Sequence, residues 1–157
     1  AIQICQQGHE IQGLSEQEVC VEQMTARACR KELQTLRETI GTVTEEPCVF
    51  FRIPGGEYNN EVLRTVYACG SYPVAWSIDS LDWKDRGTED IIKQCTYRVD
   101  NGDIVLFHND SNDIVNALPT VIKHYQGLGY TILPVSELLL DGEYTIDVQG
   151  KQHPKET

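Results

Sequence analysis

The sequence is poor in basic residues and contains no long apolar run. It has 13 lysines and arginines against 24 aspartates and glutamates, which gives a formal net charge of -11 at pH 7. Because nucleic-acid phosphates require a basic surface, this balance argues against a nucleic-acid partner. No apolar run reaches the ~18 residues of a membrane-spanning helix, and no polybasic segment suggests attachment to a lipid surface. We therefore expect no nucleic-acid binding and no membrane insertion.

The chain also lacks any Cys-x-x-Cys pair. Its six cysteines are widely and irregularly spaced: Cys5, Cys20, Cys29, Cys48, Cys69 and Cys95. A thiolate zinc site or a dithiol redox motif is therefore not expected. Cys29, Cys69 and Cys95 fall on the apolar sides of predicted helices, which favours free, buried thiols, with a disulfide as the alternative.

Strand-like and helix-like segments alternate along the 157 residues, without a linker or an internal repeat. Helices are predicted where apolar residues recur every three or four positions after a capping residue: 25–40 after Thr25, 59–69 after Asn59 or Asn60, 88–95 capped by Thr88, and 112–125 after Asn112 or Asp113. Strands are predicted at 8–11, 48–52, 72–78, 104–107 and 130–133. Repeated βα units of this length predict an α/β fold with a parallel sheet.

The segment from Val74 to Lys84 joins a buried strand to a polar end. Two carboxylates, Asp79 and Asp82, stand beside Trp83 where the strand should finish. In parallel sheets and barrels, the loops that follow the carboxyl ends of strands carry the chemistry. The segment is therefore a candidate site. The alternative is that both aspartates cap the next turn and Trp83 is a packing residue.

Two other predicted strand ends carry polar groups that suit the same chemistry. One gives Arg52 followed by Ile-Pro-Gly-Gly, and the other gives His108 after Ile-Val-Leu-Phe. A carboxylate beside His108 would orient its ring and favour its protonated form, making it a proton donor. Arg52 could order a carboxylate or a substrate oxygen, and Gly55 leaves a backbone amide open to an oxyanion. The alternative for His108 is a hydrogen-bonded histidine with a structural role.

These motifs, in this order, closely resemble a known family. Residues 51–56, 76–84 and 104–108 resemble the polysaccharide deacetylases of the NodB-homology type, carbohydrate esterase family 4. Shorter matches extend the resemblance over residues 8–140: 8–11, 117–119, 129–130 and 135–138. The resemblance implies a deformed (β/α) barrel, and we expect it to lack its first strand or strands here. We expect this domain over residues 1–140, incomplete at its N-terminus, and an edge strand with a polar tail over 141–157.

The resemblance also implies an activity and a role for four residues. Members remove acetyl groups from N-acetylated sugars, of the chitin-oligomer or peptidoglycan type, with a divalent metal such as zinc or cobalt. The arginine matching Arg52 orients the catalytic base, and the residue matching Gly55 offers its backbone amide to the oxyanion. The aspartate matching Asp82 tunes the general-acid histidine, which matches His108.

Two further positions are implied to form the substrate pocket. The tryptophan matching Trp83 and the leucine matching Leu106 line the apolar space around the acetyl methyl group. The expected partner is accordingly an N-acetylated polysaccharide or oligosaccharide. No signal-peptide pattern precedes Ala1, so the sequence leaves the compartment open, and a family-typical location would be extracellular or in the cell envelope.

The sequence departs from the family in its metal-binding half. Leu14 and Glu18 stand where the family's His-Ser/Thr-x-x-His motif has its two histidine ligands. Leucine cannot bind a metal, whereas Glu18 could serve as a hard oxygen ligand. The strand ending in Thr-Phe-Asp-Asp, which supplies the catalytic base and a third ligand, does not precede Gly8. The segment 144–148 weakly resembles that strand, so a circular permutation with Asp147 as base is an alternative to a plain edge strand.

Three explanations fit these departures. The chain is a piece of a longer protein, or an inactive relative that binds glycans, or an atypical metal binder that uses Glu18. A barrel without its first strands would expose a sheet edge, which leads us to expect a homo-oligomer.

Overall fold

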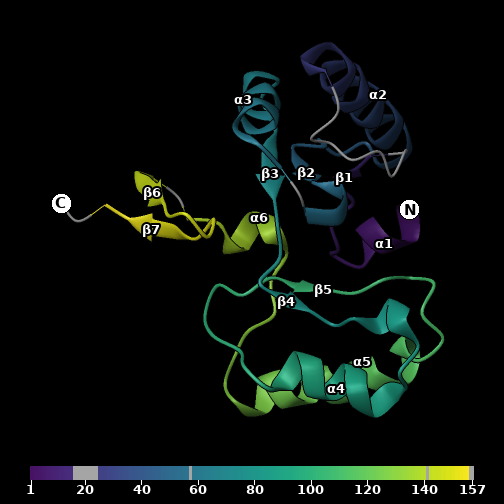
Figure 1. Cartoon of the computed structure of the whole chain (residues 1–157). Helices are drawn as coiled ribbons and strands as arrows, with labels where there is room; N and C mark the ends of the chain where they lie inside the picture. The colour runs from purple at the N-terminus through teal and green to yellow at the C-terminus, as the bar shows by residue number, and fades with distance from the viewer. Residues whose placement is uncertain (16–24, 57, 141, 156–157) are drawn as a thin grey trace. The chain divides into compact units, whose positions relative to one another are not determined.

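The computed structural model describes residues 1–15, 25–56, 58–140 and 142–155. It divides into two compact units, Ala1–Ala75 and Trp76–Thr157. Both units combine helices with short parallel strands (Figure 1). None of the helices in the described ranges has both the length and the apolarity that crossing a bilayer requires.

The first unit contains a parallel sheet of three short strands. In the order β1 (Gly13–Leu14), β2 (Phe50–Arg52) and β3 (Tyr72–Val74), each strand is hydrogen-bonded to the next. The register places Leu14 opposite Arg52, and Arg52 opposite Val74. All three strands therefore end at the same level. The helical elements of this unit are α1 (Ile2–Gln6), α2 (Ala26–Thr44), the 3-10 turn η2 (Pro54–Gly56) and α3 (Asn60–Ala68).

The helix starts of the first unit follow the predicted capping residues. The Thr25 side chain accepts the backbone N–H of Ala28 at 3.2 Å, and Asn59 accepts that of Val62 at 2.9 Å. Each cap satisfies one backbone donor that the first helical turn leaves unpaired. α2 ends at Thr44, four residues beyond the predicted end at residue 40. The two helices cover the sheet through one apolar core: Cys29, Leu33, Leu36, Phe51, Ile53, Val62 and Val66.

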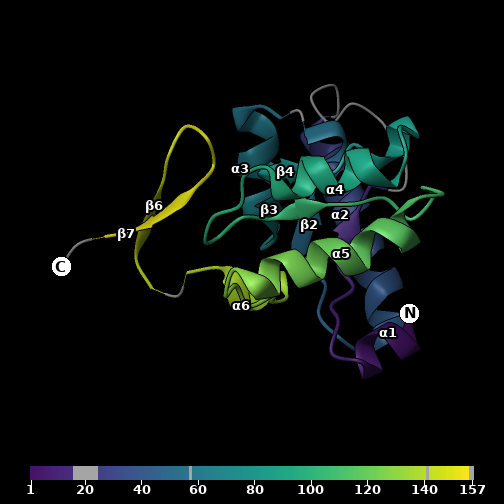
Figure 2. The ribbon, with the colours of Figure 1, turned by 90° about the horizontal axis from the view of Figure 1, so that it is seen from below.

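The second unit is built around the parallel pair β4 (Ile78–Asp79) and β5 (Val105–Leu106). The remaining elements are the 3-10 turn η3 (Asp82–Lys84), α4 (Thr88–Thr96), α5 (Ile114–Gly127), α6 (Val135–Leu138), β6 (Tyr144–Ile146) and β7 (Gln152–Pro154). α4 and α5 pack against each other, as Figure 2 shows. Their shared core consists of Ile91, Cys95, Ala117, Val121 and Tyr125. Every cysteine among the described residues is a free thiol, as predicted.

Three local predictions were wrong. The single strand predicted over 72–78 is divided into β3 and β4, which pair with different neighbours. No strand forms at 130–133, because this run of strand-forming residues has no partner among the described residues, and Ile132 and Leu133 are exposed. At α4, Gly87 precedes the first helical residue, and the Thr88 hydroxyl donates to Asp113 at 2.9 Å instead of capping the helix.

Of the two strands predicted near the chain ends, the first is misplaced and the second is present. No strand covers residues 8–11, and β1 begins two residues later, at Gly13. The predicted edge strand near residues 143–148 is β6, and it pairs antiparallel with β7 (Figure 1). In the turn between them, the Asp147 carboxylate accepts the backbone N–H groups of Gln149 and Lys151 and contacts the His153 ring at 2.8 Å. Asp147 thus closes the hairpin turn.

The cap at Asn59 yields a test of the first unit. Asn59→Ala removes the acceptor for the Val62 N–H and should lower the free energy of unfolding by about 1 kcal/mol, measured by urea denaturation. Asn60→Ala is the matched control, since Asn60 is the neighbouring exposed amide and already lies inside the helix. Equal losses in the two variants would contradict the assignment of Asn59 as the cap.

Candidate active site

The turn after β4 holds a buried carboxylate in an unusual backbone conformation. Asp82 begins η3 and is only 1% exposed. The residues flanking this turn, Leu81 and Asp85, have φ angles of 52° and 48°. Side chains other than glycine rarely adopt this left-handed region, and such outliers gather at functional sites. The turn is therefore held in place by its surroundings.

Asp82 binds His108 through both carboxylate oxygens. Its Oδ1 lies 2.7 Å from the His108 ring Nδ1, and its Oδ2 accepts the His108 backbone N–H at 2.8 Å. An ionised carboxylate can only accept hydrogen bonds, so Nδ1 carries the proton of this contact. This assignment leaves Nε2 as the ring nitrogen that can exchange a proton with a ligand. The His108 side chain is 28% exposed, whereas that of Asp82 is fully buried.

Opposing effects determine the pKa of Asp82. Burial alone would raise it, because a charged carboxylate loses hydration. The hydrogen bonds from the His108 backbone and ring and from Ser80 stabilise the ionised form, and the net result is a pKa below the ordinary aspartate value. Asp82 is therefore a permanent anion at neutral pH and can stabilise a positive charge on the His108 ring.

The strand register explains how these two residues meet. Asp79 lies opposite Leu106, so β4 and β5 end at nearly the same level, and their following loops carry Asp82 and His108 (Figure 1). This juxtaposition is the one predicted from the strand ends. It tells against the alternative that Asp82 only caps a turn.

Trp83 and Leu106 lie next to this pair in the chain. The Trp83 backbone N–H donates to Asp82 Oδ1 at 3.1 Å, while its side chain is 55% exposed. The Lys84 ammonium lies 5.0 Å from the centre of the Trp83 ring. An exposed indole is not a core packing residue, so Trp83 is available to a ligand. Leu106 is half-buried at the end of β5. Their predicted function as pocket walls stays a prediction.

Arg52 and Gly55 belong to the first unit. Arg52 is half-buried at the carboxyl end of β2, and Gly55 lies in η2 with a φ of 67°. A β-carbon at Gly55 would meet no atom within 4 Å, so the backbone conformation, and not crowding, favours glycine there. These residues are placed within their own unit, and their joint action with His108 stays a prediction.

The described residues do not fit the metal that the family resemblance implies. Leu14, which stands where the family resemblance predicts a histidine ligand, is 40% exposed at the end of β1, opposite Arg52. Glu18, the predicted substitute ligand, lies outside the described residues. Within the described ranges, no three His, Cys, Asp or Glu side chains are grouped closely enough to hold a metal ion.

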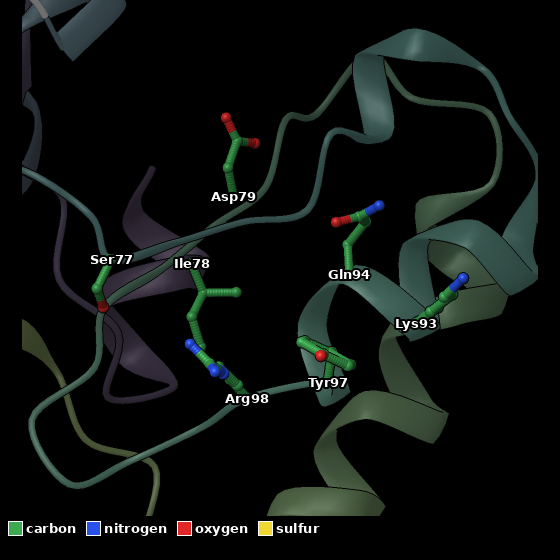
Figure 3. A pocket seen from close by; sticks show the side chains of 7 residues that line it. All are labelled: Ser77, Ile78, Asp79, Lys93, Gln94, Tyr97 and Arg98. Carbon is green, nitrogen blue, oxygen red and sulfur yellow. The ribbon is translucent and has the colours of Figure 1, made fainter.

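A hollow of about 500 Å³ lies beside β4 on the second unit (Figure 3). It is lined by Ser77, Ile78, Asp79, Lys93, Gln94, Tyr97 and Arg98. Lys93 and Gln94 lie in α4, and Tyr97 and Arg98 follow its last residue. None of these four residues was predicted to line a site, although the spacing of four between Lys93 and Tyr97 and between Gln94 and Arg98 is a signal of a shared face. In Figure 3 the Asp79 carboxylate points away from Arg98.

The sequence of this chain is similar to those of known polysaccharide deacetylases. Residues 1–74 match the family profile described as polysaccharide deacetylase. A peptidoglycan-N-acetylglucosamine deacetylase of Bacillus cereus is 30% identical over 142 residues, which cover 87% of this chain and 66% of the relative. The peptidoglycan-N-acetylmuramic acid deacetylase PdaA of Bacillus subtilis is 27% identical over 76% of this chain and 47% of its own length. The chain thus spans between about half and two thirds of these relatives.

Solved structures support the same fold. A carbohydrate esterase family 4 pseudoenzyme from Bacillus anthracis superposes with a TM-score of 0.82 and 23% identity, covering 87% of this chain and 48% of that one. A family 4 carbohydrate esterase from Streptomyces lividans gives a TM-score of 0.74 and 23% identity, over 80% of this chain and 65% of the other. This likeness confirms the predicted α/β fold of the deformed (β/α) barrel type.

The low pKa of Asp82 predicts how stability depends on pH. A group whose pKa is lowered by folding stabilises the protein fully above its unfolded pKa of about 3.9, and this contribution is lost as the pH falls through the folded value. Asp82→Asn should therefore flatten the acid limb of the stability curve, measured by urea unfolding from about pH 6 to about pH 2.5.

Asp85→Asn is the control for this experiment. Asp85 is an exposed carboxylate in the same turn, and asparagine tolerates its left-handed backbone. This variant should keep the wild-type pH dependence. An acid limb in Asp82→Asn as steep as in the wild type would contradict the stabilising role of the ionised Asp82.

Proposed function

Because the chain belongs to the polysaccharide deacetylase family, we propose that the protein hydrolyses the N-acetyl groups of N-acetylated glycans, of the peptidoglycan or chitin-oligomer type. The observation that carries this proposal is the contact between Asp82 and His108, with Nδ1 bound to the buried carboxylate. That arrangement suits a histidine that donates a proton from Nε2.

The proton donor acts at the leaving group. Hydrolysis of an N-acetyl group separates acetate from an amine, and the amine nitrogen must gain a proton as the C–N bond breaks. His108 supplies this proton from Nε2, while the buried Asp82 anion stabilises the charged ring beforehand. The buried carboxylate also fixes the ring orientation, so that the proton is directed along one path.

Four other residues complete the proposed site on the strength of the family resemblance. The Gly55 amide would donate to the developing oxyanion, and Arg52 would orient the group that removes a proton from the attacking water. Trp83 and Leu106 would surround the acetyl methyl group. The exposure of the Trp83 indole supports this assignment, since an apolar surface open to solvent is what a methyl group can bind.

Family membership implies a metal-dependent reaction, and the metal we propose is zinc or cobalt. Such an ion would supply an activated water. The described residues offer no ligand set for it, so we propose that Glu18 binds the metal together with ligands outside the described residues.

Since several relatives are named as peptidoglycan deacetylases, we propose a location in the cell envelope or outside the cell. Self-association through an exposed sheet edge is a further proposal.

A second function is favoured by one observation. Leu14 lies exposed at a strand end where the family has a metal ligand. A protein that binds N-acetylated glycans without hydrolysing them would tolerate leucine there. In that case Trp83 and the ring of His108 would serve as a stacking surface and a hydrogen-bond donor.

Replacement of the proton donor tests the first function. His108→Ala should reduce acetate release from chito-oligosaccharides or peptidoglycan fragments by at least ~100-fold, because the amine would leave without general-acid assistance. The assay is run on the longest form of the protein together with metal analysis. His124→Ala, which removes an exposed histidine from α5, should leave the rate unchanged. Equal rates of acetate release for His108→Ala and the wild type would refute the proposed role of His108 as proton donor.

Loss of the exposed indole tests the second function. Trp83→Ala should weaken binding of N-acetylated oligosaccharides by about fivefold, measured by calorimetry, since a stacked ring contributes on the order of 1 kcal/mol. Tyr97→Ala is the control, because Tyr97 is a 77% exposed aromatic residue that directly follows α4 in the same unit. Binding without acetate release or bound metal would favour the glycan-binding function, and wild-type affinity in Trp83→Ala would exclude Trp83 from the site.

A further inference from the structure

Asp79, the first of the two aspartates in the Val74–Lys84 segment, makes a contact that the proposed reaction does not use. The Asp79 carboxylate oxygen Oδ1 accepts the backbone N–H of Leu81 at 2.9 Å. Asp79 is half-buried at the end of β4, and Leu81 is the residue immediately before η3. This bond thus spans the junction between the strand and the turn that carries Asp82.

Leu81 needs such a contact because its backbone is strained. Its φ and ψ are 52° and 27°, in the left-handed region that a branched side chain disfavours. A side-chain oxygen two residues earlier, accepting the backbone N–H, is the type of local bond that stabilises tight turns. Without it, Leu81 would relax towards an ordinary conformation, and the chain would leave β4 in another direction.

The conformation of Leu81 also determines where Asp82 lies. The turn closes on Leu81, since its carbonyl accepts the Lys84 N–H at 3.0 Å. Ser80, which is fully buried, adds a longer bond of 3.4 Å from the Asp82 N–H to its hydroxyl oxygen. A rotation at Leu81 would therefore move Asp82 away from the His108 ring, to which it is now bound at 2.7 Å.

We propose that Asp79 is a positioning residue, whose carboxylate holds Leu81 in the left-handed conformation and thereby directs Asp82 onto His108. The catalytic meaning of this contact rests on the proposed function. The effect of Asp79 on the position of Asp82 does not depend on the proposed function, because it concerns only the bond between Asp82 and His108. It applies equally to a hydrolase and to a glycan-binding protein.

A role for Asp79 as a binding residue of the neighbouring hollow has less support. Asp79 lines this hollow together with Lys93 and Arg98. Its carboxylate points away from Arg98 in Figure 3, and the one side-chain hydrogen bond it makes within the described residues goes to the Leu81 N–H. The carboxylate is thus committed to the backbone of its own turn.

Two substitutions separate the acceptor from the charge. Asp79→Asn keeps an oxygen that can accept the Leu81 N–H but removes the charge, whereas Asp79→Ala removes both. Asp85→Asn is the matched control, since it removes an exposed carboxylate three residues after Asp82, as Asp79 lies three residues before it. The readout is the proton NMR signal of the His108 Nδ1–H, which a strong bond to a carboxylate moves downfield and protects from exchange.

Asp79→Ala should differ from the other two variants. Asp79→Asn and Asp85→Asn should keep the downfield His108 signal, while Asp79→Ala should broaden it or shift it upfield by more than the other two. An unchanged signal in Asp79→Ala would overturn the proposal. Equal changes in Asp79→Ala and Asp79→Asn would overturn it as well, because the effect would then come from the lost charge.

A measurement on the wild-type protein covers the case in which Asp79→Ala does not fold. The Leu81 amide proton should exchange slowly with solvent in the wild type, because it is bound to Asp79 Oδ1, and Asp79→Asn should keep this protection. A Leu81 amide that exchanges freely in the folded wild-type protein would overturn the proposal.

Acetate release is measured separately on the same variants. If the protein is a hydrolase, Asp79→Ala should lower kcat and leave KM unchanged, and Asp79→Asn should restore most of the rate. Absence of turnover in the wild type would refute the proposed hydrolysis alone, whereas the NMR signals decide the positioning role of Asp79 in either case.

Discussion

The hydrogen bond between Asp82 and His108 is the interaction on which the second unit depends. It joins two residues that are 26 positions apart, and one of them is a buried charge. A buried anion that loses its partners typically lowers the free energy of unfolding by about 3–5 kcal/mol. The strand register and the packing of α4 on α5 must therefore keep the loops that carry Asp82 and His108 in place. Only because β4 and β5 end together can one carboxylate bind both the backbone and the ring of His108.

Local strain accompanies this bond. Leu81 and Asp85 are left-handed on either side of the three-residue turn, and neither is a glycine. An unstrained turn would be more stable but would aim Asp82 elsewhere. The hydrogen bonds that the Leu81 N–H donates to Asp79 and the Trp83 N–H donates to Asp82 offset the strain, so the folded protein retains a conformation that the isolated segment would avoid. The geometry of the proton donor is thus a product of the whole turn.

Features that depend on interactions between neighbouring residues, such as helix caps, could be predicted from the sequence. Thr25 and Asn59 cap their helices because each cap involves only neighbouring residues. The meeting of Asp82 with His108 was also predictable, since parallel strands end at one edge. Strand pairing at 72–78 and 130–133 was not, because the partner of a strand lies elsewhere in the chain. The left-handed Leu81 carries no signal of its own, as leucine rarely adopts that conformation.

The two functions proposed for this chain make the same demand on the second unit. An oriented imidazole donor beside an exposed indole serves a glycan that is hydrolysed and a glycan that is only bound. The Asp82–His108 pair therefore cannot distinguish them. Hydrolysis additionally requires a group that activates water, and the family resemblance predicts a metal ligand for this purpose at the strand end beside Arg52. Leu14 lies at that strand end, and a leucine side chain binds methyl groups and rings but no ions. Residue 14 is consequently the position at which a hydrolase and a glycan-binding protein of this fold would diverge.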